Sequence, residues 1–175
     1  MQNFIIRITQ ENNNLLKNAE IGCYILPDTT SPAFAEEFIK KAHAADKLVL
    51  CEGDNAADFY LQYNPDGLIL NTVQEANPSK KIKEVRQKVK KAVLGVITRN
   101  RRHEAMLVSE CEPDFVIFRF WKDGLDKTKE LLDWYAELFL IQNAAQIEED
   151  FDFSSLHADF IILDDVKYLR ALKNY

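Results

Sequence analysis

The sequence predicts an α/β fold in which parallel strands and helices alternate and close into a compact (β/α)8 barrel. Eight short apolar runs, the first of them weaker, recur roughly 20–26 residues apart, and most end in a polar or acidic residue. Continuous apolar runs are typical of parallel strands that are buried on both faces. The runs are 4–8, 21–28, 47–54, 66–72, 92–100, 114–120, 137–143 and 158–165.

The segments between the runs have apolar residues at helical spacing, which completes the alternation of strand and helix. Ser31-Pro32 and Pro78-Ser79 provide start signals for two of these helices, because proline is favoured in the first helical turn. The expected helices are 33–45, 56–63, 79–90 and 125–137, and the last has Leu131, Trp134 and Leu138 on its apolar face.

The length of the chain limits this barrel. Such barrels usually have ~200 residues or more, so 175 residues predict one stripped-down domain over 1–175 with a short or degenerate first unit. The alternative is an open, doubly wound parallel sheet. A dinucleotide-binding version of that sheet is disfavoured, because only five glycines are present and no glycine-rich turn follows a run.

Composition and charge narrow the function classes. The net charge is −6 and the isoelectric point about 5.1, which argues against nucleic-acid binding by the whole protein. No apolar run approaches the ~18 residues of a membrane span, and no signal peptide is expected. The three widely spaced cysteines, Cys23, Cys51 and Cys111, favour a reducing compartment over a disulfide framework. A cytoplasmic protein is therefore expected.

Basic residues concentrate in one window. Residues 79–102 contain ten lysines and arginines but a single acid, Glu84. The lysines fit a solvated helix face. Arg99, Arg101 and Arg102 instead follow the strand at 92–98, on the edge where such barrels bind ligands, and arginine suits phosphate or carboxylate. They are candidate anion ligands, and salt bridges to a second copy in a homodimer are the competing interpretation.

Acidic residues end two other runs. Glu52 and Asp54 follow the third strand, and Asp164 and Asp165 follow the eighth. Carboxylates at a barrel mouth can hold Mg²⁺, so Glu52 and Asp54 are candidate metal ligands. Helix capping is the competing interpretation for these side chains, and Asp54-Asn55 and Asp164 fit it well.

The histidines do not suggest a metal centre. His43, His103 and His157 share no zinc-ligand spacing with one another or with the cysteines. His103 follows the arginines and is the weak candidate for a general acid or base. A solvated histidine in a first helical turn is the alternative.

Several motifs together resemble the divergent thiamine phosphate synthase-like proteins of alphaproteobacteria. They lie in the family's order over about residues 20–165, although each alone is loose. The resemblance implies a bacterial (β/α)8 barrel of thiamine biosynthesis, which joins a pyrimidine pyrophosphate to a thiazole phosphate with Mg²⁺. The motifs are PDGLIL (65–70), RRHEAM (101–106), EPDFVIFRF (112–120), WYAELF (134–139) and HADFIILDD (157–165).

Most positions that bind substrate in that family carry other residues here. Leu26-Pro27-Asp28 replaces a basic pair, and Gln142-Asn143 replaces the phosphate-binding glycine pair. Arg119 replaces a glycine of the sixth strand, and Asn71 lies where His-Leu-Gly-Gln is expected. The resemblance therefore places Asn71, Arg119 and Asn143 at the mouth as candidate ligand-binding residues.

The departures predict a barrel with a degenerate active site that binds a small phosphorylated or anionic molecule without standard synthase turnover. Two alternatives remain open at this point. One is an active thiamine phosphate synthase-like transferase with an altered site. The other is a non-catalytic interaction or scaffold protein, in which the basic helix faces another copy.

Overall fold

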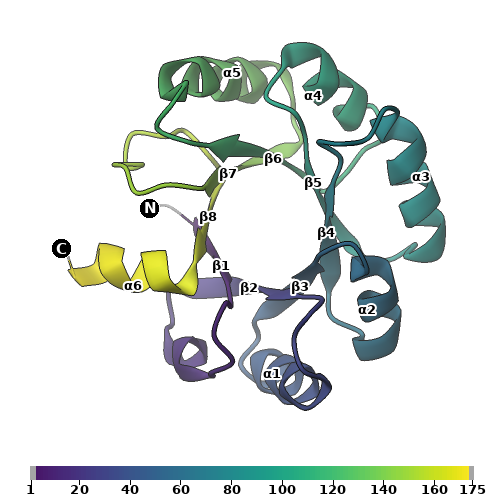
Figure 1. Cartoon of the computed structure of the whole chain (residues 1–175), viewed down its shortest axis with the longest axis vertical. Helices are drawn as coiled ribbons and strands as arrows, with labels where there is room; N and C mark the ends of the chain where they lie inside the picture. Colours follow the sequence, from purple (N-terminus) through teal and green to yellow (C-terminus); the bar gives the residue numbers. More distant parts are fainter. Residues whose placement is uncertain (1–2, 174–175) are drawn as a thin grey trace.

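The computed structural model describes residues 3–173 and contains a closed barrel of eight strands in the order β1 to β8. Every neighbouring pair is parallel, including β8 with β1, so the predicted barrel is confirmed and the open sheet is excluded (Figure 1). The strands are β1 (Asn3–Arg7), β2 (Ile21–Pro27), β3 (Leu48–Glu52), β4 (Gly67–Asn71), β5 (Val93–Ile97), β6 (Phe115–Phe120), β7 (Gln142–Ile147) and β8 (Phe160–Asp164).

Helices surround most of the barrel (Figure 1). The first crossover holds only the short 3-10 helix η1 (Asn14–Lys17), which confirms the degenerate first unit. The connection from β7 to β8 contains no helix in the described chain. The sequence did not predict that this second helix would be missing. The helices are α1 (Pro32–Ala44), α2 (Ala56–Tyr63), α3 (Pro78–Lys88), α4 (Arg102–Ser109), α5 (Leu125–Leu138) and α6 (Asp165–Lys173).

The seventh strand lies later in the chain than the apolar run 137–143 predicted. That run contains the last two residues of α5, a short connection and only the first two residues of β7. Leu138, expected on the apolar face of the helix, is 63% exposed, while Tyr135 is fully buried. The true strand reads QNAAQI, and its small and polar residues produce a weaker pattern than the apolar run before it.

The barrel interior is apolar from its amino end to its middle. One cluster of inward side chains includes Ile25, Leu50, Ile69, Ile117 and Ile162. Gly95 leaves room for Phe115, whose ring carbon Cζ is 2.4 Å from where a Cβ on Gly95 would lie. A larger cluster fills the space between the strands and the helices. These two layers are what a parallel barrel with strands buried on both faces requires.

Asp165 closes the barrel seam between β8 and β1. Its buried carboxylate accepts hydrogen bonds from the backbone N–H groups of Thr9 and Gln10 at 3.0 and 3.1 Å, and from the Thr9 hydroxyl. Asp164 accepts from the Lys167 N–H at 2.7 Å, so the predicted cap at α6 is confirmed. The short first unit is therefore anchored from the far end of the chain.

The basic window does not form a uniform outer face. Arg86 donates to the Ala92 carbonyl at 2.7 Å, and Lys81 lines the cavity at the carboxyl end of the barrel. Only the remaining lysines fit the solvated face that the sequence predicted. None of the helices in residues 3–173 is long and apolar enough to cross a membrane.

Candidate functional site

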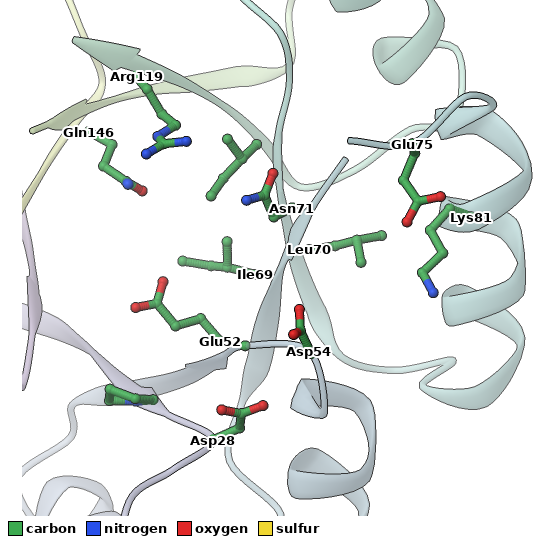
Figure 2. Close-up of a pocket in the computed structure, with 13 residues that line it drawn as sticks. Asp28, Glu52, Asp54, Ile69, Leu70, Asn71, Glu75, Lys81, Arg119 and Gln146 are labelled. Carbon is green, nitrogen blue, oxygen red and sulfur yellow. The ribbon is translucent and has the colours of Figure 1, made fainter. Parts of the chain in front are cut away.

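A polar cavity lies at the carboxyl ends of the strands, and we call it the mouth. It has a volume of about 480 Å³, and residues from β2, β3, β4, β5, β6 and β7 and the segments after them surround it (Figure 2). Parallel barrels carry their sites at this edge, so its position agrees with the sequence prediction. The lining residues are Pro27, Asp28, Glu52, Gly53, Asp54, Ile69, Leu70, Asn71, Glu75, Lys81, Ile97, Arg119 and Gln146.

An ion pair crosses the inside of the barrel at the base of the mouth. Arg7, the last residue of β1, donates through Nε and Nη2 to both carboxylate oxygens of Glu52, with 3.0 Å for the Nη2 bond. The two side chains are 19% and 18% exposed. Burial alone would lower the pKa of Arg7, but the hydrogen bonds and charge of Glu52 outweigh it and raise that pKa. Arg7 therefore stays charged and holds Glu52.

Arg119 belongs to a second polar group on β6 and β7. Its Nε donates to Glu148 at 2.6 Å, and Gln146 Nε2 donates to the same carboxylate oxygen at 2.5 Å. The Arg119 guanidinium also lies 4.7 Å from the ring centre of Trp121. These contacts orient the arginine, and its terminal N–H groups remain for a ligand.

The opposite side of the mouth is acidic. We call Asp28 and Asp54 the acidic wall. Asp28 accepts a hydrogen bond from the Asn55 N–H at 2.7 Å, so it caps α2 from the loop after β2. This contradicts the capping role predicted for Asp54-Asn55, since the Asn55 side chain makes no cap hydrogen bond. Gly53 permits the arrangement, because it has a φ of +123° and a Cβ there would lie 2.2 Å from the Asp28 carboxylate.

A second cavity of about 400 Å³, the arginine pocket, adjoins the mouth and shares Arg119 with it. Arg99 and Arg101 lie on its wall, each 3.8 Å from Glu104 Oε1, and Arg99 Nε donates to the Val73 carbonyl at 2.7 Å. No carboxylate is among the described residues that line this cavity. Glu104 and Glu148 pair with its arginines from outside the lining, so the guanidinium groups are the charged groups that an entering anion would meet. The lining residues are Val73, Gln74, Thr98, Arg99, Asn100, Arg101, Arg119 and Trp121.

The predicted Mg²⁺ ligands do not form a metal site in this arrangement. Both oxygens of Glu52 accept from Arg7, which takes this side chain away from a cation. Asp54 lines the mouth, but residues 3–173 contain no group of three acidic, histidine or cysteine side chains placed to hold a metal ion. Mg²⁺ prefers several converging oxygen ligands, so the residues present do not fit it.

Three other predicted site residues lie away from the mouth. Arg102 is on α4 and its guanidinium is 5.0 Å from the ring centre of Trp134. His103 is exposed and lines a separate cavity of about 150 Å³, together with residues of α3 and α4. Asn143 is buried at the amino end of β7, where it exchanges hydrogen bonds with Asp159 at 2.8 and 3.2 Å. Its expected place was wrong because the strand was misplaced.

Sequence reasoning missed Arg7, Lys81 and Gln146. Arg7 is the last residue of β1, the weak first run. Polar residues at other strand ends were site candidates, so the same criterion would have identified it. Gln146 lay outside the predicted seventh strand, so the same error that displaced Asn143 hid it. Lys81 is in the first turn of α3, which the sequence treated as an outer face. The mouth does contain the predicted residues Glu52, Asp54, Asn71 and Arg119.

The chain has a TIM-barrel fold, and solved structures of that fold are similar to it throughout. Citrate synthase SbnG matches with a TM-score of 0.65 and 11% identity over 99% of this chain and 91% of that one. A glycerol uptake operon antiterminator regulatory protein from Listeria monocytogenes gives 0.65 and 16% over 96% and 94%. Tryptophan synthase from M. tuberculosis gives 0.66 and 10% over 99% and 86%.

At these identities the likeness shows the fold alone, because one barrel hosts many chemistries. No family model matches the chain, and no curated protein matches it. The resemblance to thiamine phosphate synthase-like proteins therefore stays a prediction.

Proposed function

We propose that this protein binds a small phosphorylated or anionic molecule at the barrel mouth and does not carry out standard thiamine phosphate synthase turnover. The observation that carries the proposal is the arginine pocket. Three arginines line it, the carboxylates that pair with them, Glu104 and Glu148, lie outside the lining, and one of the arginines, Arg119, also lines the mouth. Guanidinium groups bind phosphate and carboxylate through paired, charge-assisted hydrogen bonds.

The connection after β7 argues against a synthase-like site. In the resembling family a glycine pair in that region lets backbone N–H groups approach a phosphate. Here Glu148, Glu149 and Asp150 follow β7, and no helix of the described residues starts there to offer its N-terminus. Acidic side chains repel a phosphate. The anion is therefore expected on the β5–β6 side, at Arg99, Arg101 and Arg119.

The engagement of Glu52 by Arg7 argues against Mg²⁺-dependent transfer. A synthase-like reaction needs a metal beside its pyrophosphate, and the residues present do not fit one. The remaining polar groups of the mouth can bind and orient a ligand. Binding without turnover is the function that this arrangement supports best.

Calorimetric titration with inorganic pyrophosphate and inorganic phosphate tests the proposal. We expect binding by the unaltered protein and a loss of about tenfold or more in Arg119→Gln, since a hydrogen bond to a charged group contributes about 1.5–3 kcal/mol. Lys83→Gln removes the same charge from an exposed position on α3 and serves as the matched control.

The outcomes are distinct. Equal losses in Arg119→Gln and Lys83→Gln would indicate only a general charge effect and would contradict a site at Arg119. The purified protein is also incubated with the two standard synthase substrates and Mg²⁺. Formation of thiamine phosphate would overturn the part of the proposal that excludes turnover.

A further inference from the structure

We propose that the ligand is a zwitterion, whose anionic group lies at Arg119 and whose protonated amine lies at the acidic wall. This inference rests on the proposed function, because it starts from an anion on the β5–β6 side. It adds the chemical class of the rest of the molecule. The mouth has opposite charges on its two sides, and a purely anionic ligand would use only one of them.

The opposition of charge is visible in the mouth (Figure 2). Arg119 and Gln146 project from β6 and β7 on one side, while Asp28 and Asp54 follow β2 and β3 on the other. Four carboxylates but only two cationic side chains line the cavity. An anion that entered alone would face this excess of negative charge. A positive group on the same molecule would remove that penalty.

A buried amide oxygen supports a ligand that also donates hydrogen bonds. Gln146 is 5% exposed, and its Oε1 has no hydrogen-bond partner among the described residues. Its Nε2 is held by Glu148, so the amide is oriented with the oxygen left as an acceptor at the mouth. A buried acceptor without a donor costs about 1–3 kcal/mol. A ligand N–H group would satisfy it once the side chains that cover this oxygen move aside.

The acidic wall fits an ammonium group better than a metal ion. Asp28 keeps one carboxylate oxygen on the Asn55 N–H, which leaves the other oxygen for a ligand. Asp54 is exposed on the mouth and is not engaged by a described hydrogen-bond donor. Divalent cations need several converging oxygens, whereas an ammonium is satisfied by one to three acceptors. Two separate carboxylates provide that number.

The experiment compares pairs of probes that differ in one group. Aminoalkyl phosphates with two, three and four carbons are titrated at pH 7.5 against the hydroxyalkyl phosphates of the same lengths. We expect the amine to bind about tenfold tighter at one chain length, from a charge-assisted hydrogen bond to the acidic wall. The length with the largest ratio reports the distance between the two sides of the mouth.

Two variants test whether the acidic wall causes the preference for the amine over the alcohol. Asp54→Asn is expected to reduce the amine-to-alcohol ratio to about twofold or less, with the affinity for the alcohol unchanged or slightly higher. Asp54 is exposed, so this variant is expected to fold, and thermal unfolding checks that it does. Asp58→Asn makes the same change on the exposed surface of α2 and is expected to keep the full ratio.

The results separate this inference from the proposed function. Equal affinities for amine and alcohol at every length would overturn the zwitterion and leave the anion site intact. No binding of either probe, together with no binding of pyrophosphate, would overturn the proposed function itself. If Mg²⁺ strengthened pyrophosphate binding and Asp54→Asn abolished that effect, the wall would hold a metal, and the zwitterion would again be overturned.

Discussion

The two ends of the barrel interior are built by the same strands but have opposite chemistry. At the amino end, Phe115 and Phe160 meet edge to face with ring centres 5.9 Å apart, and Cys23 and Val93 pack beside them. At the carboxyl end, inward positions of the same sheet carry Arg7, Glu52, Arg119 and Gln146. Along β6, for example, the inward residues Phe115 and Ile117 are apolar, whereas Arg119, two positions further on, is charged.

This difference separates stability from binding. Apolar side chains at the amino end lose contact with water on folding, so they stabilise the barrel. Charged groups at the carboxyl end lose hydration, and their ion pairs only partly offset that loss. The ion pairs Arg119–Glu148 and Arg7–Glu52 therefore add little net stability to the fold, which agrees with a role in binding.

The largest expected effect is at the amino end. Phe115→Ala removes a ring that fills the space beside Gly95, and it is expected to lower the free energy of unfolding by about 3–5 kcal/mol. Urea denaturation measures this. Trp121→Ala, a half-exposed aromatic at the other end, is the control and is expected to cost below about 1 kcal/mol. Similar costs for both variants would break the comparison.

The ion pair beneath the mouth is expected to have the next largest effect. Arg7→Met leaves the Glu52 carboxylate half-buried without its partner, at an expected cost of about 2–3 kcal/mol at pH 7. The double variant Arg7→Met/Glu52→Leu removes both charges and is expected to regain at least half of that loss. If the double variant were less stable than Arg7→Met, the pair would not be the cause.

Alkaline pH probes the buried thiols. Burial raises the pKa of Cys23 and of Cys51 to about 12. Both thiols stay neutral in the folded protein, whereas in the unfolded chain they ionise near pH 8.5–9. Their stabilisation is therefore complete below about pH 8.5 and is lost as pH rises toward 12, by about 1.5–2 kcal/mol for each thiol at pH 10.

Urea denaturation at pH 8 and pH 10 measures this loss. Cys51→Ala is the comparison, and its stability is expected to fall less between the two pH values than that of the unaltered protein. Native Cys23 and Cys51 are also expected to resist iodoacetamide at pH 8, by mass spectrometry. Rapid alkylation of either in the folded state would contradict the raised pKa.

The smallest expected effect concerns Asn143, which the sequence placed at the mouth and the structure places at the amino end. Asn143→Ala removes the acceptor for the Asp159 N–H and is expected to cost about 1 kcal/mol of stability. Its affinity for pyrophosphate, measured by calorimetry, is expected to equal that of the unaltered protein. A loss of affinity comparable to that of Arg119→Gln would reverse this assignment.

Prediction from the sequence succeeded where a pattern was local and strong. The runs of β2 to β6 and of β8 are apolar enough to identify each strand, and Asp164 was correctly interpreted as a cap. It failed at β7, because the end of α5 is more apolar than the strand itself. Because the predicted strand ended at residue 143, Asn143 was wrongly assigned to the mouth and Gln146 was not identified as a mouth residue.

The sequence by itself determined the parallel barrel of eight strands, apart from the position of β7, together with the shortened first unit and the edge of the barrel where polar residues gather. These follow from burial and periodicity, which are properties of neighbouring residues. Only the tertiary structure decided that Arg7 pairs with Glu52 from 45 positions away, and that Arg119 faces the acidic wall of Asp28 and Asp54. Charges act across space, and closing the barrel is what brings them within reach of one another.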